Sequence, residues 1–190
     1  MFNHSCEVQA VADSDPVQRP RQAETPTIRV REPADDPAIA ATITAAFAGA
    51  SETALVNALR HDGDMILELV AQMDDQLIGH IAYSRLSVTS ASASLNATAL
   101  APLSVFPSHQ HRGVGSALIK ASITHLKRQG VELAVVLGHP NYYVRFGFSN
   151  LLARLLDAPY AGDAFMALEL APGSVRSQRW TVTYPLAFSR

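Results

Sequence analysis

The sequence has little cysteine, no long apolar run and no strong net charge, and each absence excludes a class of protein. Cys6 is the single cysteine among 190 residues, so the chain forms no internal disulfide and builds no thiolate metal cluster. Its apolar segments are shorter than the roughly 18 to 20 residues that span a bilayer. A formal net charge of −2 argues against DNA, RNA or an anionic membrane as the main ligand.

The N-terminal sequence also lacks the basic start and apolar run of a secretory signal, so we expect a soluble cytoplasmic protein. Residues 1–26 are polar, contain several prolines and show no apolar period, which predicts a disordered tail. Residues 27–190 are expected to form one domain, because 48% apolar and 17% charged residues are an ordinary globular balance. The seven histidines show no metal-ligand spacing, and we expect no metal site.

The hydrophobic pattern of the remaining chain predicts a mixed α/β sheet. The expected strands are 27–32, 65–73, 76–87, 99–106, 131–137, 165–170 and 181–184. The expected helices are 37–48, a stretch that begins at Ser51, 113–129 and 141–146. The pair Asp74-Asp75 indicates a hairpin, and the strand–helix–strand segment 99–137 indicates a right-handed crossover.

A glycine-bearing turn at the start of helix 113–129 is the clearest functional signal. Backbone N–H groups at a helix N-terminus lack partners within the helix and lie at the positive end of its dipole. Gly113 and Gly115 remove the Cβ atoms that would keep an anion away. The turn therefore predicts a site for a diphosphate, to which Arg112, His109 and His111 add positive charge.

Other interpretations of this turn stay open on the residues alone. A P-loop needs Gly-x-x-x-x-Gly-Lys-Ser/Thr, and no Lys-Ser or Lys-Thr follows these glycines. A dinucleotide fingerprint needs a small residue where Leu118 stands and an acid at the end of the next strand, whereas Glu132 lies at its start. A glycine turn that only caps a structural helix is the third possibility.

Two motifs in the right order resemble the GNAT N-acetyltransferase superfamily. Gln110-x-x-Gly113-x-Gly115 resembles its (Gln/Arg)-x-x-Gly-x-(Gly/Ala) signature, and LGHPNYYVRFGF at 137–148 resembles its later motif, which ends in Gly-Phe. Gly-His-Ile at 79–81, YYVRFGF, and FMALEL followed by Pro-Gly resemble a bacterial branch of predicted N-acetyltransferases. The resemblance extends from about residue 27 to the C-terminus.

This resemblance implies a GNAT fold, a mixed and mostly antiparallel sheet with flanking helices that splays between its fourth and fifth strands to bind acetyl-CoA. The backbone of Leu103 and Val105 would then hold the pantetheine arm, and an amide near Val105 would stabilise the oxyanion. The residues implied to hold the pyrophosphate are Gln110, His111, Arg112, Gly113, Val114, Gly115, Ser116 and Ala117.

The resemblance also makes Tyr143, four residues before Gly147, the candidate catalytic acid. A tyrosine with the ordinary pKa of about 10 stays protonated at neutral pH and donates to a leaving thiolate; the alternative is that Tyr143 only packs against the cofactor. The general base is open between Glu52 and His80. Each also has a structural interpretation, as a solvated helix-start carboxylate and a buried, hydrogen-bonded histidine.

The implied activity is acetyl-CoA-dependent acetylation of a primary amine by direct attack on the thioester. The acceptor is expected to be a small amine, an amino-acid derivative or a protein amine, with no nucleic-acid or membrane partner, and family habit suggests a homodimer. The alternatives are a catalytically idle sensor that binds acyl-CoA and a nucleotide-binding protein that uses the same turn.

Overall fold

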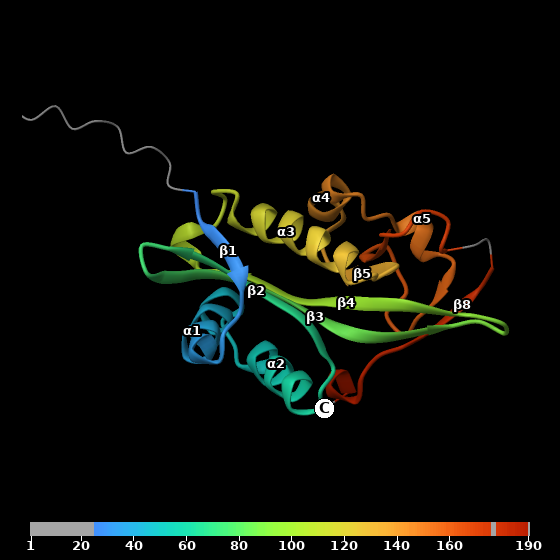
Figure 1. Cartoon of the computed structure of the whole chain (residues 1–190), viewed down its shortest axis with the longest axis horizontal. Coiled ribbons are helices and arrows are strands. Elements are labelled where there is room, and N and C mark those ends of the chain that lie inside the picture. The colour runs from blue at the N-terminus through green and yellow to red at the C-terminus, as the bar shows by residue number, and fades with distance from the viewer. Residues whose placement is uncertain (1–24, 176–177, 190) are drawn as a thin grey trace, which may run out of the picture.

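The computed structural model describes residues 25–175 and 178–189 of the chain. The expected tail, residues 1–26, thus lies outside the described residues except for its last two positions. The described part contains an eight-stranded mixed sheet with helices on both sides (Figure 1). This is the α/β architecture that the sequence predicts.

The sheet is antiparallel apart from two parallel pairs, β4 with β5 and the short β6 with β8. The strands are β1 (Thr27–Val30), β2 (Met65–Met73), β3 (Gln76–Thr89), β4 (Ser94–Val105), β5 (Leu133–Leu137), β6 (Leu156–Asp157), β7 (Phe165–Glu169) and β8 (Trp180–Thr183). The main spatial order is β1-β2-β3-β4-β5-β7, and β8 pairs with the far end of β3.

The helices lie in two groups, with α1 and α2 on one side of the sheet and α3, α4 and α5 on the other (Figure 1). Their bounds are α1 (Asp36–Phe47), α2 (Ser51–His61), α3 (Val114–Arg128), α4 (Pro140–Tyr143) and α5 (Asn150–Ala153). Short 3-10 turns occupy η1 (Pro33–Asp35), η2 (Pro107–His109), η3 (Val144–Phe146) and η4 (Leu186–Ser189).

Each face of the sheet buries its own set of apolar side chains. Leu118 of α3 is fully buried in a cluster with side chains of β2, β3 and β5. On the opposite face, Ile39 and Ile43 of α1 and Val56 of α2 pack over Val70. Burial contributes about 25 cal/mol per Å² of apolar surface, so contacts on both faces hold the central strands as a rigid platform.

The hairpin between β2 and β3 has the expected turn. Asp74 and Asp75 adopt φ values of +46° and +59°, and a two-residue type I′ turn requires positive φ at both central positions. Aspartate tolerates this left-handed conformation better than most residues, so the hairpin prediction is confirmed.

The other predicted elements are present with shifted ends. β4 begins at Ser94 rather than at residue 99, because the Ser/Ala/Thr-rich segment already pairs with β3 from Thr89 onward. β5 begins at Leu133 rather than at 131, and β1 ends at Val30 rather than at 32. The short elements α5, β6 and η4 were not predicted, since four residues or fewer carry no readable period.

The sheet opens between β4 and β5. The two strands pair in parallel from Ala97 opposite Leu133 to Leu100 opposite Val136. Beyond Leu100, β4 continues beside β3 to Val105, and its ladder with β5 stops. The splay expected between the fourth and fifth strands is therefore confirmed.

A bulge in β4 lies at the point where the strands part. Ile81 of β3 is opposite Leu103, whereas Tyr83 is opposite Leu100, so β4 contains one more residue than β3 in this interval. A bulge bends its strand and increases the local twist, which helps to carry the end of β4 away from β5.

Candidate active site

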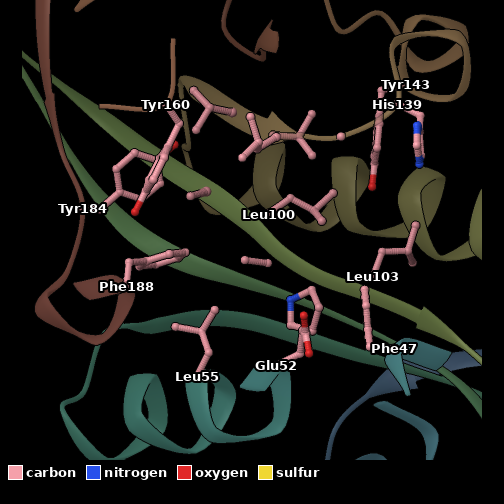
Figure 2. A pocket seen from close by; sticks show the side chains of 17 residues that line it. Phe47, Glu52, Leu55, Leu100, Leu103, His139, Tyr143, Tyr160, Tyr184 and Phe188 are labelled. Atoms are coloured by element: carbon pink, nitrogen blue, oxygen red, sulfur yellow. The ribbon is translucent and has the colours of Figure 1, made fainter. Parts of the chain in front are cut away.

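Two adjoining cavities occupy the opening between β4 and β5. The first, here called the acceptor cavity, has a volume of about 460 Å³ and extends from the splayed strands toward α2 and η4 (Figure 2). The second, here called the groove, has a volume of about 1170 Å³ and extends over the start of α3 toward α4. The residues common to both linings are Phe47, Leu103, His139 and Tyr143.

The free edge of β4 forms one wall of the groove. The Phe106 N–H donates to the Ile78 carbonyl of β3 at 2.8 Å. Because strand N–H and C=O groups alternate in direction, those of Leu103 and Val105 point away from β3. The Gln110 side-chain amide donates to the Val105 carbonyl at 3.1 Å. An extended ligand can therefore add to this edge like a further strand, through the Leu103 backbone and the Val105 N–H.

The turn before α3 forms the floor of the groove. His111 and Gly113 have φ values of +58° and +86°, and no side chain caps the helix at Gly113. The first bond of α3 runs from the Ala117 N–H to the Gly113 carbonyl at 2.9 Å. The N–H groups of Val114, Gly115 and Ser116 therefore precede the helical ladder and are available to an anion.

Most of the predicted pyrophosphate residues line the groove, and two do not. Those that line it are Gln110, His111, Gly113, Val114, Gly115 and Ser116, together with Leu103 and Val105 of β4. Arg112 is exposed and absent from the lining, and the Ala117 N–H is already used within α3. The motif thus locates the turn, but the helix geometry decides which of its amides are left without a partner in the helix.

The two glycines of the turn are required for different reasons. A Cβ atom on Gly113 would meet nothing within 4 Å, but its φ lies in the left-handed region that favours glycine. A Cβ atom on Gly115 would lie 2.6 Å from the Tyr142 hydroxyl oxygen. Gly115 therefore makes room for a protein side chain as well as for a ligand.

Other residues also line the groove, among them Asn141, Tyr142 and Arg145. The Arg145 guanidinium lies over the Tyr142 ring, 4.6 Å from its centroid, and its Nε donates to the Tyr142 carbonyl at 3.1 Å. The pair gives the groove a cation that is held against the Tyr142 ring. Tyr142 and Arg145 are three residues apart in the second motif, and side chains at this spacing are neighbours on a helical turn.

Tyr143 stands where the two cavities meet. Its side chain packs edge-to-face against Tyr142 and Phe148 at centroid distances of 5.1 and 5.7 Å. A Cβ atom on Gly138 would lie 2.5 Å from the Tyr143 ring, so glycine at the end of β5 allows this position. The hydroxyl points into the acceptor cavity (Figure 2). Burial, and to a lesser degree Tyr142, raise the pKa of Tyr143 to about 12.

Glu52 enters the acceptor cavity from the other side. It lies in the first turn of α2, and its carboxylate points into the cavity opposite Tyr143 (Figure 2). The Ser51 hydroxyl donates to Glu52 Oε2 at 2.9 Å. A carboxylate and a protonated phenol thus face the same space, as an acid–base pair requires.

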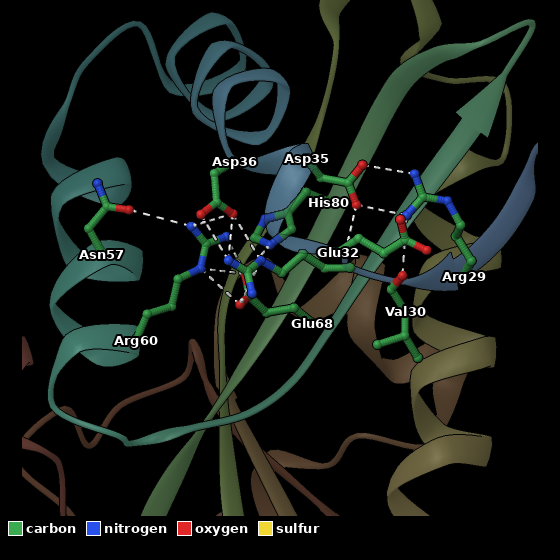
Figure 3. A network of polar contacts seen from close by, with 10 residues as sticks. Arg29, Val30, Glu32, Asp35, Asp36, Asn57, Arg60, Glu68 and His80 are labelled. Atoms are coloured by element: carbon green, nitrogen blue, oxygen red, sulfur yellow. Dashed lines mark hydrogen bonds and ion pairs between the residues drawn. The ribbon is translucent and has the colours of Figure 1, made fainter.

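His80, the other candidate base, lies outside both cavities. Its ring is fully buried, and its Nε2 is 2.9 Å from Glu68 Oε1 (Figure 3). The Glu68 carboxylate also accepts bonds of 2.6 and 2.9 Å from Arg60. Burial lowers the pKa of His80 despite the neighbouring Glu68, and its Nδ1 has no partner. A neutral ring that donates Nε2–H to Glu68 fits both facts, as in the structural interpretation of a buried, hydrogen-bonded histidine.

The described residues give no sign of a metal site. Within 25–175 and 178–189, no three His, Cys, Asp or Glu side chains are grouped so as to hold a metal ion. In the same ranges, no helix combines the length and apolar character needed to cross a membrane.

The chain is similar to known acetyltransferases. Residues 27–151 match the domain family described as "Acetyltransferase (GNAT) domain". The chain is 34% identical over 139 residues to the uncharacterized N-acetyltransferase YjhQ of Escherichia coli (strain K12), covering 72% of each. It is 33% identical over 166 residues to the uncharacterized N-acetyltransferase YhbS of that strain, covering 86% of this chain and 98% of YhbS.

Two solved structures are similar to this chain in fold and sequence. The YhbS structure from E. coli in complex with CoA has a TM-score of 0.81 and 32% identity, covering 91% of this chain and 97% of YhbS. A GNAT family acetyltransferase from Brucella melitensis in complex with acetyl-CoA has a TM-score of 0.71 and 32% identity, covering 86% of this chain and 97% of that one.

Proposed function

The chain belongs to the GNAT acetyltransferase family, and from that membership we propose that it transfers the acetyl group of acetyl-CoA to a primary amine. The observation that carries the proposal is the position of the Tyr143 hydroxyl, at the junction of a groove with a strand edge and a cavity with a carboxylate. The CoA and acetyl-CoA complexes of the two structural relatives support the choice of cosubstrate.

Acetyl-CoA would bind along the groove. The pantetheine arm would pair with the Leu103 backbone and the Val105 N–H, while the Gln110 side chain keeps the Val105 carbonyl satisfied. The pyrophosphate would accept hydrogen bonds from the N–H groups of Val114 to Ser116, and Arg145 would lie beside it. The thioester would then lie next to Tyr143, which lines both spaces.

The reaction would be a direct transfer. The amine nitrogen attacks the thioester carbonyl carbon, a C–N bond forms, and the C–S bond breaks. A backbone N–H on the open edge of β4 stabilises the oxyanion that develops. Glu52 accepts the proton that the amine loses, directly or through a water molecule, and the Tyr143 O–H donates a proton to the departing sulfur. Solvent returns the proton to Tyr143 and removes the one on Glu52.

Calorimetric titration with acetyl-CoA tests the first half of this proposal, and the chain supplies a matched pair of variants. Gly113 and Gly130 both have left-handed φ, +86° and +71°, and a Cβ atom on either would meet nothing within 4 Å. Gly113 lines the groove at the start of α3, whereas Gly130 follows its other end. Gly113→Leu should abolish binding, and Gly130→Leu should share the backbone strain but keep the affinity.

Release of free CoA thiol in the presence of amines tests the second half. Thiol release that requires both acetyl-CoA and an amine supports the transferase. Tight acetyl-CoA binding with no release for any amine would instead favour the idle sensor. Competition by ATP or NAD at the same site would favour the nucleotide-binding alternative.

A further inference from the structure

The far side of the acceptor cavity carries an aromatic wall, defined as Tyr160, Tyr184 and Phe188. The Tyr184 ring packs edge-to-face against both neighbours, with centroids 5.1 Å from Tyr160 and 5.0 Å from Phe188. The three rings lie across the cavity from Tyr143 and His139 (Figure 2). A ligand that attacks beside Tyr143 would therefore extend its other end toward this wall.

Most of the remaining lining between the wall and Tyr143 is apolar. It includes Leu55 of α2, Leu100 and Pro102 of β4, and Leu137 of β5. Leu137 is 55% exposed, a large value for a strand leucine, and it lines the cavity. Apolar surface left open in a pocket is the usual counterpart of an apolar ligand body.

The charged side chains of the lining also restrict which ligands the cavity can bind. Among the described residues that line the acceptor cavity, Glu52 is the sole carboxylate, lysine and arginine are absent, and His139 lies beside Tyr143, across the cavity from the aromatic wall (Figure 2). One carboxylate matches one ammonium group. A ligand carboxylate would be desolvated here without a cation to pair with, and the further ammonium groups of a polyamine would lack partners.

On the basis of the proposed function, we propose that the acceptor is a small primary monoamine on an aromatic or branched aliphatic body that carries no carboxylate. The ammonium group binds at Glu52 and loses one proton to this carboxylate, which releases it to solvent. The neutral amine then attacks the thioester, and Glu52 accepts the second proton once the C–N bond has formed. The body packs against the apolar lining and the edges and faces of the aromatic wall, where rings interact favourably beyond their buried area. This class excludes free amino acids and polyamines as preferred acceptors.

Steady-state thiol release at saturating acetyl-CoA tests the inference with a panel of matched amines. Phenylalaninamide and phenylalanine share the ring and the amine position, and they differ in the carboxylate. We expect kcat/KM for phenethylamine, isopentylamine and phenylalaninamide to exceed that for phenylalanine and for spermidine by at least about tenfold. The reverse order would overturn the inference and leave the transferase function intact.

Variants in η4 connect the preference to the wall. Phe188→Ala should raise KM for phenethylamine about tenfold without changing KM for acetyl-CoA. Leu186→Ala is the matched control, because Leu186 lies in the same turn, is 74% exposed and does not line the cavity. An unchanged KM for phenethylamine in Phe188→Ala would show that the aromatic wall does not bind the acceptor, and would overturn this part of the inference. Acetyl-CoA binding with no turnover of any amine would overturn the proposed function, and this inference with it.

Discussion

The Tyr142 hydroxyl oxygen lies 2.6 Å from the point where a Cβ atom on residue 115 would stand. Carbon and oxygen atoms that are not bonded do not approach so closely, so Gly115 and Tyr142 occupy their positions jointly. The ring carbon that bears the hydroxyl would lie 3.7 Å from the same Cβ atom, which is ordinary contact. The conflict therefore depends on one oxygen atom.

This relationship predicts a rescue. Gly115→Ala should displace the Tyr142 ring and the Arg145 guanidinium stacked on it, and weaken acetyl-CoA binding by about 1 kcal/mol, about fivefold in Kd. Tyr142→Phe in the same chain should restore most of that loss. Calorimetric titration of the two single variants and the double variant measures the coupling. Additive losses would show that alanine at 115 disturbs the ligand directly.

Tyr143→Phe should lower kcat by about 100-fold, because it removes the proton donor, and leave the Kd for acetyl-CoA unchanged. Tyr83→Phe is the control: Tyr83 is buried, bonds Ser122 at 2.9 Å and lines neither cavity. It should lose about 1 kcal/mol of stability and no rate. Single-turnover thiol release separates the two, and an unaltered maximal rate in Tyr143→Phe would disprove the acid role.

The pKa of Tyr143 makes a separate pH prediction. Tyrosine donates in its protonated form, which persists below its pKa, and burial raises that pKa to about 12. The native rate should therefore show no fall caused by Tyr143 between about pH 8 and pH 10, where an ordinary tyrosine begins to ionise. A falling limb near pH 10 that disappears in Tyr143→Phe would contradict the burial effect.

Glu52→Gln and His80→Gln distinguish the two candidate bases. Glu52→Gln should lower kcat/KM by about 100-fold and flatten any rising limb of the pH–rate profile, because the proton acceptor is lost. His80→Gln should keep the native profile and lower Tm, since His80 lines neither cavity and bonds the buried Glu68. Rates for both across the pH range, with melting curves, test the assignment. A flattened profile in His80→Gln alone would reverse it.

The buried network around Glu68 predicts a loss of stability in acid. Burial alone would raise the pKa of Glu68, but hydrogen bonds from His80 and Arg60 outweigh burial and lower it from 4.5 to about 2. A carboxylate with a depressed folded pKa stabilises the fold above its unfolded pKa. That stability is lost as the pH falls from about 4.5 toward about 2, by on the order of 3 kcal/mol.

Glu68→Gln provides the comparison for this prediction. It should cost about 3 kcal/mol at neutral pH, because Arg60 loses its buried carboxylate partner and keeps the more exposed Asp36. Its stability should also fall less steeply in acid than that of the native chain. Denaturant unfolding of both proteins at neutral and acidic pH measures the difference. Parallel pH dependences would mean that other carboxylates, such as Asp35 beside Arg29, account for the acid sensitivity.

Much of the fold could be predicted from short-range sequence patterns. The Asp74-Asp75 turn, the helix after Gly113 and the buried strand before Leu137 each follow from a few neighbouring residues. The starts of β4 and β5 were misplaced because strand pairing, and not composition, decides where a ladder begins.

The candidate site could likewise be predicted only in part. The two motifs contain Gly113 and Tyr143, but they do not show that Ala117 bonds its own helix or that Arg112 is absent from the lining of the groove. Whether His80 reaches the ligand depends on which face of β3 it occupies, and a bulge shifts that register. The aromatic wall was not predicted, since segments well apart in the chain meet only in the folded molecule.

The free edge of β4 also bears on solubility. An unpaired strand edge is a template for pairing with another chain, which leads to aggregation. Here the edge lies inside a groove whose other walls are Gly115 and Ser116 of α3 and Tyr142 of α4, and Gln110 occupies the Val105 carbonyl. One narrow extended ligand can enter, but a second sheet cannot. The same geometry that admits a ligand therefore prevents this edge from pairing with a strand of another molecule when no ligand is bound.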